Sequence, residues 1–560
     1  MAHSLDLVFL WHMHQPDYRA PGHGDFALPW TYLHAMKDYT DMAAHLERHP
    51  SLRAVVNFVP VLLDQIEDYA TQIARRELRD PLLRLLAHPQ PEALTADERR
   101  HALASCFRAH RAHAIDPFPA YQRLLAMHEL ATAQGVDSTA WLSGPYFADL
   151  VTWYHLAWTG ESMRRALPLI AELMTKGEAY THADRIALLD AIGDQLQQLL
   201  PRYRALAARG QIELSSTPYA HPIAPLMLSF ESAREAWPDA QLPLSPCYPG
   251  GRERLDRHIA GAIEHHRERF GAPPAGVWPA EGAVSAASLA RFSAHGVGWV
   301  ATGEAVLANT LGPQHYVRER DLYRPWRDAS GVSIVFRDDR LSDLIGFEYA
   351  KWHGQDAARH FVAELDDILA RTPDDVTPLV SVILDGENAW EYYPYNGYWF
   401  FEDLYTLLAA HPRIRTCTLS DALDAHAART GTLPPLVAGS WVHGTLSTWI
   451  GDPDKNHAWD LLCSAKHQYD IVLGSARLDD AARARAERLL STCEGSDWFW
   501  WLGDYNPADS VASFEALFRR NLAALYAALG LTPPAQLERP LSRGGGHAEA
   551  GGTMRRAREP

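Results

Sequence analysis

Cysteine is scarce in this sequence, and the five residues form no binding pattern. They are odd in number, widely spaced and lack any CxxC pair: Cys106, Cys247, Cys417, Cys463 and Cys493. A disulfide framework and a thiolate zinc site both show as cysteines at characteristic spacings. The sequence therefore predicts neither feature and favours a reducing compartment.

Long apolar runs and clusters of basic residues are also missing. No segment approaches the roughly 20 apolar residues that span a bilayer. The apolar stretch at 5–11 has neither a basic flank nor a small-residue cleavage site. The net charge is −17, whereas phosphate binding needs clustered lysine and arginine. We therefore expect a cytoplasmic protein with no membrane or nucleic-acid partner, and the sequence carries no signal for an oligomeric state.

The chain does contain many apolar and aromatic residues. Apolar residues make up 47% of its 560 residues and charged residues 22%, as in a folded protein that is too long for one ordinary globular unit. It has 18 Trp, 22 Tyr and 17 Phe. Most of these rings belong in the core, but flat aromatic faces also stack on sugar rings. Aromatic residues beside polar clusters are therefore candidates for carbohydrate binding.

Seven short apolar runs, each ending in a polar or Gly/Pro cluster, are typical of buried parallel strands. Helix-periodic segments lie between most of them, and this alternation indicates an α/β fold, either a β/α barrel or an open sheet. The runs span residues 5–11, 53–59, 211–216, 275–279, 297–302, 332–337 and 379–385.

Three regions depart from this alternation. Residues 60–210 are almost entirely helix-periodic, and we interpret them as a helical insertion in a catalytic barrel of residues 1–400. Residues 401–535 are largely helical again and predict a C-terminal domain that contributes to the cleft. The Gly-rich, charged tail at 541–560 is expected to be disordered because it has almost nothing to bury.

Polar side chains follow several of the predicted strands, at the position where β/α barrels carry catalytic groups. One acidic residue after a strand is most often a helix cap, but several such clusters on one rim are harder to explain in that way. We therefore predict a site at this rim. The clusters contain His12 and His14, Glu213 and His221, Glu281, Arg337 with Asp338 and Asp343, and Asp385 with Glu387.

Two of these carboxyl groups suit the cleavage of a glycosidic bond, which needs one protonated and one ionised carboxyl group across a pocket. Glu281 lies beside Trp278, a candidate sugar platform. Asp385 ends the most hydrophobic strand, a setting that raises a carboxyl pKa. Glu387 is the alternative acid, or a residue that binds the substrate.

Five segments, in order and spacing, resemble the five motif regions of glycoside hydrolase family 57. They are residues 12–16, 210–227, 276–285, 382–397 and 439–459, of which the stretch DGENAWEYYPYNG is highly specific. The similarity covers residues 1 to about 525 and is greatest to the α-amylase and amylopullulanase branch. It implies an incomplete (β/α)7 barrel followed by a helical bundle, a retaining mechanism, and no required metal or other cofactor.

The resemblance also assigns roles to residues. The third region places the nucleophile at Glu281, and the fourth places the general acid/base at Asp385. His14 and Glu213 would line the donor subsite, and three residues of the fifth region would approach the sugar. The expected substrate-binding residues, ending with those three, are His12, His14, Glu213, His221, Trp278, Arg337, Asp338, Glu387, Trp390, Trp441, His443 and Trp449.

Some residues have a second interpretation. His12 and His14 would point the same way on a strand and could form a zinc site with Asp385 or His221. Neutral histidines that bind sugar hydroxyls explain the pair equally well, and we predict no metal. The run 496–506 is expected to pack in the helical domain, with Trp498 or Trp500 as candidates to reach the cleft.

Together these features predict a retaining glycoside hydrolase that cleaves α-glucosidic bonds in starch, glycogen or maltooligosaccharides. One alternative is a 4-α-glucanotransferase or branching enzyme, which would use the same two carboxylates with a sugar hydroxyl in place of water. The other is a non-catalytic glucan-binding protein.

Overall fold

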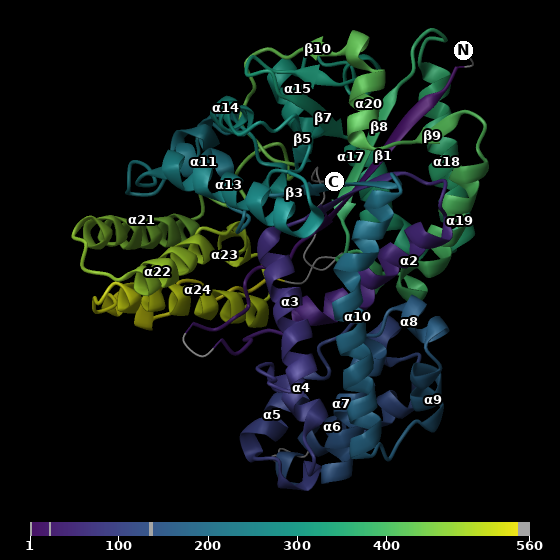
Figure 1. Cartoon of the computed structure of the whole chain (residues 1–560), viewed down its shortest axis with the longest axis vertical. Coiled ribbons are helices and arrows are strands. Elements are labelled where there is room, and N and C mark those ends of the chain that lie inside the picture. Colours follow the sequence, from purple (N-terminus) through teal and green to yellow (C-terminus); the bar gives the residue numbers. More distant parts are fainter. Residues whose placement is uncertain (1–2, 22–23, 134–137, 547–560) are drawn as a thin grey trace.

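Seven parallel strands form a closed ring, and the labelled strands lie in the upper half of Figure 1. The computed structural model describes residues 3–21, 24–133 and 138–546. The ring closes where β8 meets β7 at a single residue pair, and β3 likewise meets β4 at a single pair. All seven predicted strands are present, and the predicted (β/α)7 class is confirmed. In ring order the strands are β1 (Leu5–Met13), β2 (Ala54–Phe58), β3 (Ile212–Ser216), β4 (Gly276–Val277), β5 (Trp299–Gly303), β7 (Ser333–Arg337) and β8 (Leu379–Asp385).

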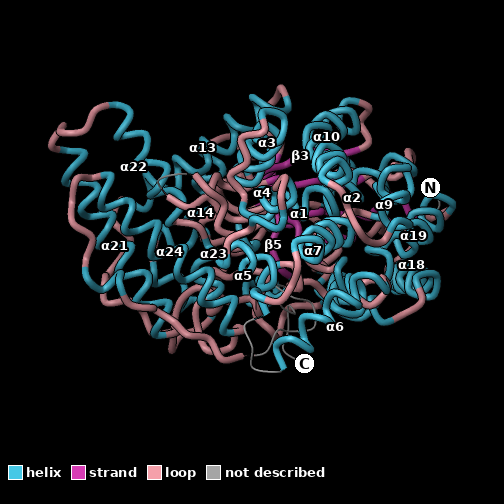
Figure 2. Tube along the Cα trace, turned by 90° about the horizontal axis from the view of Figure 1, so that it is seen from below, coloured by secondary structure: helices cyan, strands magenta, loops and turns pink. Residues whose placement is uncertain are grey.

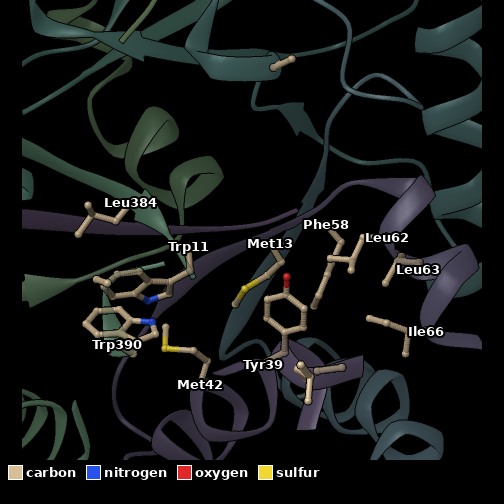
Figure 3. Close-up of a cluster of buried hydrophobic side chains, with 14 of the residues drawn as sticks. Trp11, Met13, Tyr39, Met42, Phe58, Leu62, Leu63, Ile66, Leu384 and Trp390 are labelled. Carbon is tan, nitrogen blue, oxygen red and sulfur yellow. The ribbon is translucent and has the colours of Figure 1, made fainter. Parts of the chain in front are cut away.

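Side chains alternate between the two faces of each strand, as the pleat requires. On β1, Val8 and Leu10 point into the barrel, where they pack in a small interior core. Trp11 and Met13 point outward into the main core. Figure 3 shows these two side chains among Trp390 and residues of the surrounding helices. Each fully buried side chain of this size contributes roughly 1.5–3 kcal/mol, so β1 is a major anchor of the fold.

Three short strands extend the sheet beyond the barrel. β6 (Trp326–Arg327) runs antiparallel to β7 and pairs with β10 (Gly431–Thr432), while β9 (Ile414–Thr416) pairs with the start of β1. Two or three residues are too few to show a hydrophobic period, which is why the sequence pattern did not reveal them.

Helices surround the barrel and cover its outer face. One of them, α20 (Leu419–Ala425), instead covers its amino end, where Leu419 and Ala422 join the interior core. The others in this layer are α1 (Trp30–His34), α2 (Thr40–Arg48), α11 (Ala224–Leu228), α12 (Ala233–Ala236), α13 (Gly251–Phe270), α14 (Ala286–Ala294), α15 (Glu304–Leu311), α16 (Arg318–Asp321), α17 (Asp339–Asp343), α18 (Gly354–Arg371) and α19 (Tyr398–Ala410).

The chain between β2 and β3 forms a helical lobe at the bottom of Figure 1, with no strand among its described residues. The two longest helices of this lobe, α3 and α10, pack against each other and lead from the barrel into it. The helices are α3 (Pro60–Arg75), α4 (Pro81–Ala87), α5 (Ala96–Ser105), α6 (Pro119–Ala133), α7 (Gly144–Ala157), α8 (Glu161–Ala166), α9 (Pro168–Lys176) and α10 (His182–Ala208).

The C-terminal helices lie together on one side of the barrel, opposite α18 and α19 (Figures 1 and 2). A buried ionic group joins them to α13. Arg254 donates to Glu494 at 2.7 Å, and His258 lies 2.7 Å from the same carboxylate. Burial alone would raise the pKa of Glu494, but these two groups lower it to about 2. The helices are α21 (Pro453–Gly474), α22 (Asp480–Cys493), α23 (Ser496–Trp501) and α24 (Ala508–Ala528).

The end of the described chain returns to these helices. The backbone N–H of Gly503 donates to Ser542 Oγ at 3.0 Å. Of the tail predicted to be disordered, residues 547–560 lie outside the described residues. All five cysteines are free thiols. In the part of the chain that the structure describes, no helix is both long and apolar enough to cross a membrane.

Candidate active site

A pocket of about 350 Å³ lies at the carboxyl ends of the barrel strands. One side carries Arg108 and Trp158 from the helical lobe, and another carries Trp500, Trp501 and Tyr505 from the C-terminal part. Three separate regions of the chain therefore build one cavity. The predicted site residues that line it are His12, His14, Glu281, Arg337, Asp385, Glu387 and Trp441.

The two predicted catalytic carboxylates enter this pocket from opposite strands. Glu281 follows β4 and Asp385 ends β8. In the ring order these strands stand three positions apart, which is the largest separation that seven strands allow. The barrel thus brings together two residues that are 104 positions apart in the sequence (385 − 281).

Glu281 is held in a strained conformation. Its φ of 58° lies in the left-handed region, which costs a residue other than glycine about 1–3 kcal/mol and is found mostly at functional sites. Trp441 Nε1 donates to Glu281 Oε2 at 3.0 Å, and the Trp441 backbone N–H donates to the Glu281 carbonyl at 3.1 Å. His221 Nδ1 lies 4.0 Å from Oε1. Trp441, expected to contact the sugar, is thus also the residue that orients this carboxylate.

Asp385 is half-buried and Glu387 is buried, and both positions favour the protonated form of the carboxyl group. Burial raises the pKa of Asp385, although Asn388, which donates to it at 2.8 Å, acts in the opposite direction. Burial and the charge of Asp385 raise the pKa of Glu387 well above its usual value. Glu387 Oε1 accepts from the His14 backbone N–H at 3.2 Å, while Oε2 is buried without a partner among the described residues.

Three histidines stack beside the pocket. His12 Nδ1 donates to Asn57 Oδ1 at 2.7 Å, so its Nε2 accepts from His221 Nε2 at 3.2 Å, and His221 Nδ1 accepts from Ser496 at 2.7 Å. Burial lowers the pKa of His12 to about 3 and that of His221 well below its usual value. Both rings are therefore neutral at physiological pH and act as hydrogen-bonding groups.

One group among the described residues has the composition of a metal site: His14, His221 and Asp497, with ligand atoms within 4.8 Å of one another. However, the His14 and His221 rings are stacked, with centroids 3.8 Å apart and planes inclined by 16°. A metal in the plane of one ring would lie out of the plane of the other. In addition, His14 Nε2 lies 2.9 Å from Asp497. The arrangement fits hydrogen-bonded imidazoles better than metal ligands.

Arg337 and Asp338 separate into two roles. Arg337 lines the pocket, pairs with Asp339 and Asp343 at 2.9 Å each, and lies 5.5 Å from the centroid of Trp441. Asp338 is fully buried and caps α17 by accepting from the Leu341 backbone N–H at 2.9 Å. The expectation that Asp338 binds substrate is therefore wrong, because its carboxylate is occupied within the fold.

Glu213 does not line the pocket as the sequence suggested. It is the second residue of β3, level with Val55 and one inward-facing layer below His12. Its carboxylate accepts from Trp299 Nε1 at 2.8 Å and from the backbone and hydroxyl of Ser420 at 2.8 and 2.9 Å. Glu213 thus ties the barrel interior to α20 at the amino end, away from the donor subsite to which it was assigned.

Other expected sugar contacts are also corrected. Trp278, Trp390 and Trp449 are at most 1% exposed and belong to the core, where Trp278 packs edge-on against Trp441. Tryptophan side chains are highly buried on average, and a sequence pattern does not show which of them reach a pocket. His221 lies beneath His14 rather than on the pocket surface, and His443 is not among the residues that line the cavity.

The pocket also contains residues that sequence reasoning missed. Four of those named below come from the segment around α1 and from the helical lobe, which carry no catalytic motif. Two of them lie within the recognised DGENAWEYYPYNG stretch and could have been found there. Trp500, a candidate for reaching the cleft, lines the pocket, whereas Trp498 is buried. The missed residues include Trp30, His34, Arg108, Trp158, Glu391, Tyr392, Asp497 and Trp501.

Comparisons with known proteins agree with this architecture. The sequence model of glycosyl hydrolase family 57 matches residues 8–434. A GH57-type branching enzyme from Pyrococcus horikoshii has a similar fold (TM-score 0.57, 17% identity, 96% of this chain and 93% of that chain). So does the α-amylase AmyC from Thermotoga maritima (0.55, 14%, 95% and 94%). A 4-α-glucanotransferase from Thermococcus litoralis is similar over 94% of this chain and 60% of its own (0.52, 13%).

Proposed function

The chain belongs to glycosyl hydrolase family 57, and from this premise we propose that it is a retaining enzyme that hydrolyses α-glucosidic bonds in α-glucans. The observation that carries the proposal is the pair of carboxylates that enter one pocket from opposite strands, Glu281 and Asp385. Cleavage of a glycosidic bond needs at least two carboxyl groups on opposite sides of the cavity that holds the bond.

The environments of the two groups support different roles. Asp385, half-buried at the end of β8 with a raised pKa, is suited to carry the proton that the leaving oxygen needs. Glu281 is oriented by the indole N–H of Trp441. In the proposed double displacement, Glu281 attacks the anomeric carbon while Asp385 protonates the leaving oxygen. Water, deprotonated by Asp385, then releases the sugar from Glu281.

Polar atoms without protein partners also support a sugar ligand. His14 Nδ1, Trp158 Nε1 and Glu387 Oε2 are buried, belong to residues that line the pocket, and have no hydrogen-bond partner among the described residues. Such groups cost free energy unless a ligand satisfies them. Sugar hydroxyls both donate and accept, so they can satisfy all three.

A second candidate function, glucanotransfer or branching, uses the same carboxylates with a sugar hydroxyl in place of water. The observation that favours it is the aromatic wall beyond Asp385, where Trp30 and Trp158 line the pocket with ring centroids 5.8 Å apart. Such a wall offers binding surface to a second sugar chain.

Incubation with maltoheptaose distinguishes the two functions. Hydrolysis increases the number of reducing ends, whereas transfer redistributes chain lengths at constant reducing ends. Proton NMR of the first product should show the retained α-anomer, and an inverted product would refute the double displacement. Glu281→Gln is the inactive control. Exhaustive chelation should leave the rate within about twofold, because no step of the proposed mechanism needs a metal.

A further inference from the structure

The pocket contains a second polar group on the segment that follows α1. His34 lines the pocket, and its Nδ1 lies 2.7 Å from Asp38 Oδ2. Asp38 is fully buried, and its other oxygen accepts from Lys37 Nζ at 2.5 Å. Because Asp38 engages Nδ1, the imidazole is held in one orientation and its Nε2 edge is left for the pocket.

The backbone explains how these polar residues are brought together. Residues Ala35–Tyr39 form a π-helical turn between α1 and α2, a feature that occurs frequently at functional sites. Lys37 also donates to Asn396 Oδ1 at 2.9 Å, and Asn396 donates to Asp41 at 2.9 Å. The turn is therefore fastened to the chain segment that follows Asp385.

Trp158 completes the group. Its ring stands edge-on to His34, with centroids 5.5 Å apart and planes at 89°, and Lys37 lies 5.3 Å from its centroid. The residue is 5% exposed and lines the pocket, yet its Nε1 has no partner among the described residues. A buried N–H in this state costs free energy, and an acceptor on a ligand in the pocket would remove that cost.

The position of the group identifies the part of the substrate that it would meet. Asp385, Asn388 and Glu391 follow one another along the chain and all line the pocket. Burial raises the pKa of Glu391, while the charges of Lys37 and His34 oppose this effect. The group therefore lies beyond Asp385, whereas the neighbours of Glu281 are Trp441 and His221.

We propose that His34 and Trp158 bind the glucose unit on the leaving-group side of the scissile bond, by hydrogen bonds from His34 Nε2 and Trp158 Nε1 to its hydroxyls. The proton donor in a double displacement stands on the side of the departing sugar, which is the side of Asp385. The inference rests on the proposed function and deepens it. In a transfer reaction the same subsite holds the acceptor sugar.

The test compares two substrates that differ on the leaving-group side. Maltoheptaose places a glucose there, whereas p-nitrophenyl α-maltoside, cleaved at its aryl bond, places a ring without sugar hydroxyls. His34→Ala and Trp158→Phe should each lower kcat/KM on maltoheptaose roughly tenfold, the effect of one lost hydrogen bond. On the aryl substrate the change should stay within about twofold, because no hydroxyl is there to be bound.

Matched controls come from outside the pocket. His411→Ala removes a histidine that also pairs with an aspartate, Asp366, at 3.3 Å, and Trp141→Phe alters a tryptophan that is 76% exposed. Neither variant should change kcat/KM on either substrate. Thermal melting followed by circular dichroism verifies the fold of each variant. If His34→Ala is unstable, Trp158→Phe still provides the test, because phenylalanine retains a buried aromatic ring at this position.

Two outcomes would overturn the inference: an equal loss on both substrates, or no loss on maltoheptaose in either variant. If the wild-type protein cleaves neither substrate, the proposed function fails, and calorimetric titration with maltoheptaose then tests the subsite alone. Weaker binding by His34→Ala than by the wild type supports it, and equal or absent binding in both refutes it.

Discussion

The glutamates at the two ends of the barrel, Glu213 and Glu281, have contrasting environments. At the amino end, Glu213 accepts three hydrogen bonds, from Trp299 and from Ser420, and is enclosed by α20. At the carboxyl end, Glu281 has a left-handed backbone, is oriented by Trp441 and borders a pocket. A satisfied carboxylate holds elements together, whereas a strained one beside a cavity is available for chemistry. The comparison therefore predicts loss of activity at one end and loss of stability at the other.

The largest effect is expected at the carboxyl end. Glu281→Gln removes the proposed nucleophile and should lower kcat on maltoheptaose by at least about 10³-fold. The free energy of unfolding should change by less than about 1 kcal/mol, since the amide keeps the shape of the side chain. Glu268→Gln, on the exposed surface of α13, is the matched control. If the variant retains a tenth of the wild-type kcat, Glu281 is not the nucleophile.

Asp385→Asn tests the other carboxylate of this end. Removal of a general acid/base costs about 10²–10⁴-fold in rate. Because burial raises the pKa of Asp385, the wild type should keep its proton donor to a higher pH than an ordinary aspartate would, and lose activity as the pH rises through that pKa. A pH profile of kcat should show this alkaline limb in the wild type. If the limb persists unchanged in Asp385→Asn, another group supplies the proton.

Glu213→Ala tests the amino end. The substitution leaves the buried Trp299 indole and the Ser420 backbone N–H without their acceptor, and should lower the free energy of unfolding by about 2–4 kcal/mol. The kcat of the folded fraction should stay within about twofold of the wild type. Urea denaturation and active-site titration measure the two quantities. Normal stability with a large loss of kcat would instead show that Glu213 acts in the substrate site.

The smallest effect is expected for Glu387→Gln. Burial and the charge of Asp385 raise the pKa of Glu387 well above its usual value, so a neutral amide resembles its protonated form, and kcat should fall less than about tenfold. A raised folded-state pKa means that stability from this group is present at low pH and is lost as pH rises towards that pKa. The variant should therefore gain stability relative to the wild type as the pH rises above the ordinary glutamate pKa, in denaturation experiments at several pH values.

A loss of kcat by more than about 10³-fold in Glu387→Gln would instead identify Glu387 as the acid, the alternative that the sequence left open. The difference between the two ends of the barrel would then still hold, but the proton donor at the carboxyl end would be Glu387 rather than Asp385.

The strands of the barrel were predictable because each is a short apolar run with a clear end, as in 379–385. The pairing of Glu281 with Asp385 was predictable because both follow such runs and both belong to recognised motifs. The helical lobe's contribution was not predictable. Trp158 and Arg108 lie in the helical lobe, just outside its helices and without any motif, and only the packing of the lobe brings them into the pocket that Asp385 lines.

The sequence by itself determined the kind of fold, through hydrophobic periods that are local properties of the chain. It also determined the family, through motifs that keep their order. Only the tertiary structure decided which motif residues face the pocket. Glu213 and Trp278 lie within motif regions and nevertheless do not line the pocket. The physical reason is that a motif fixes neighbours along the chain, whereas exposure to a cavity depends on strand register and on segments hundreds of residues away.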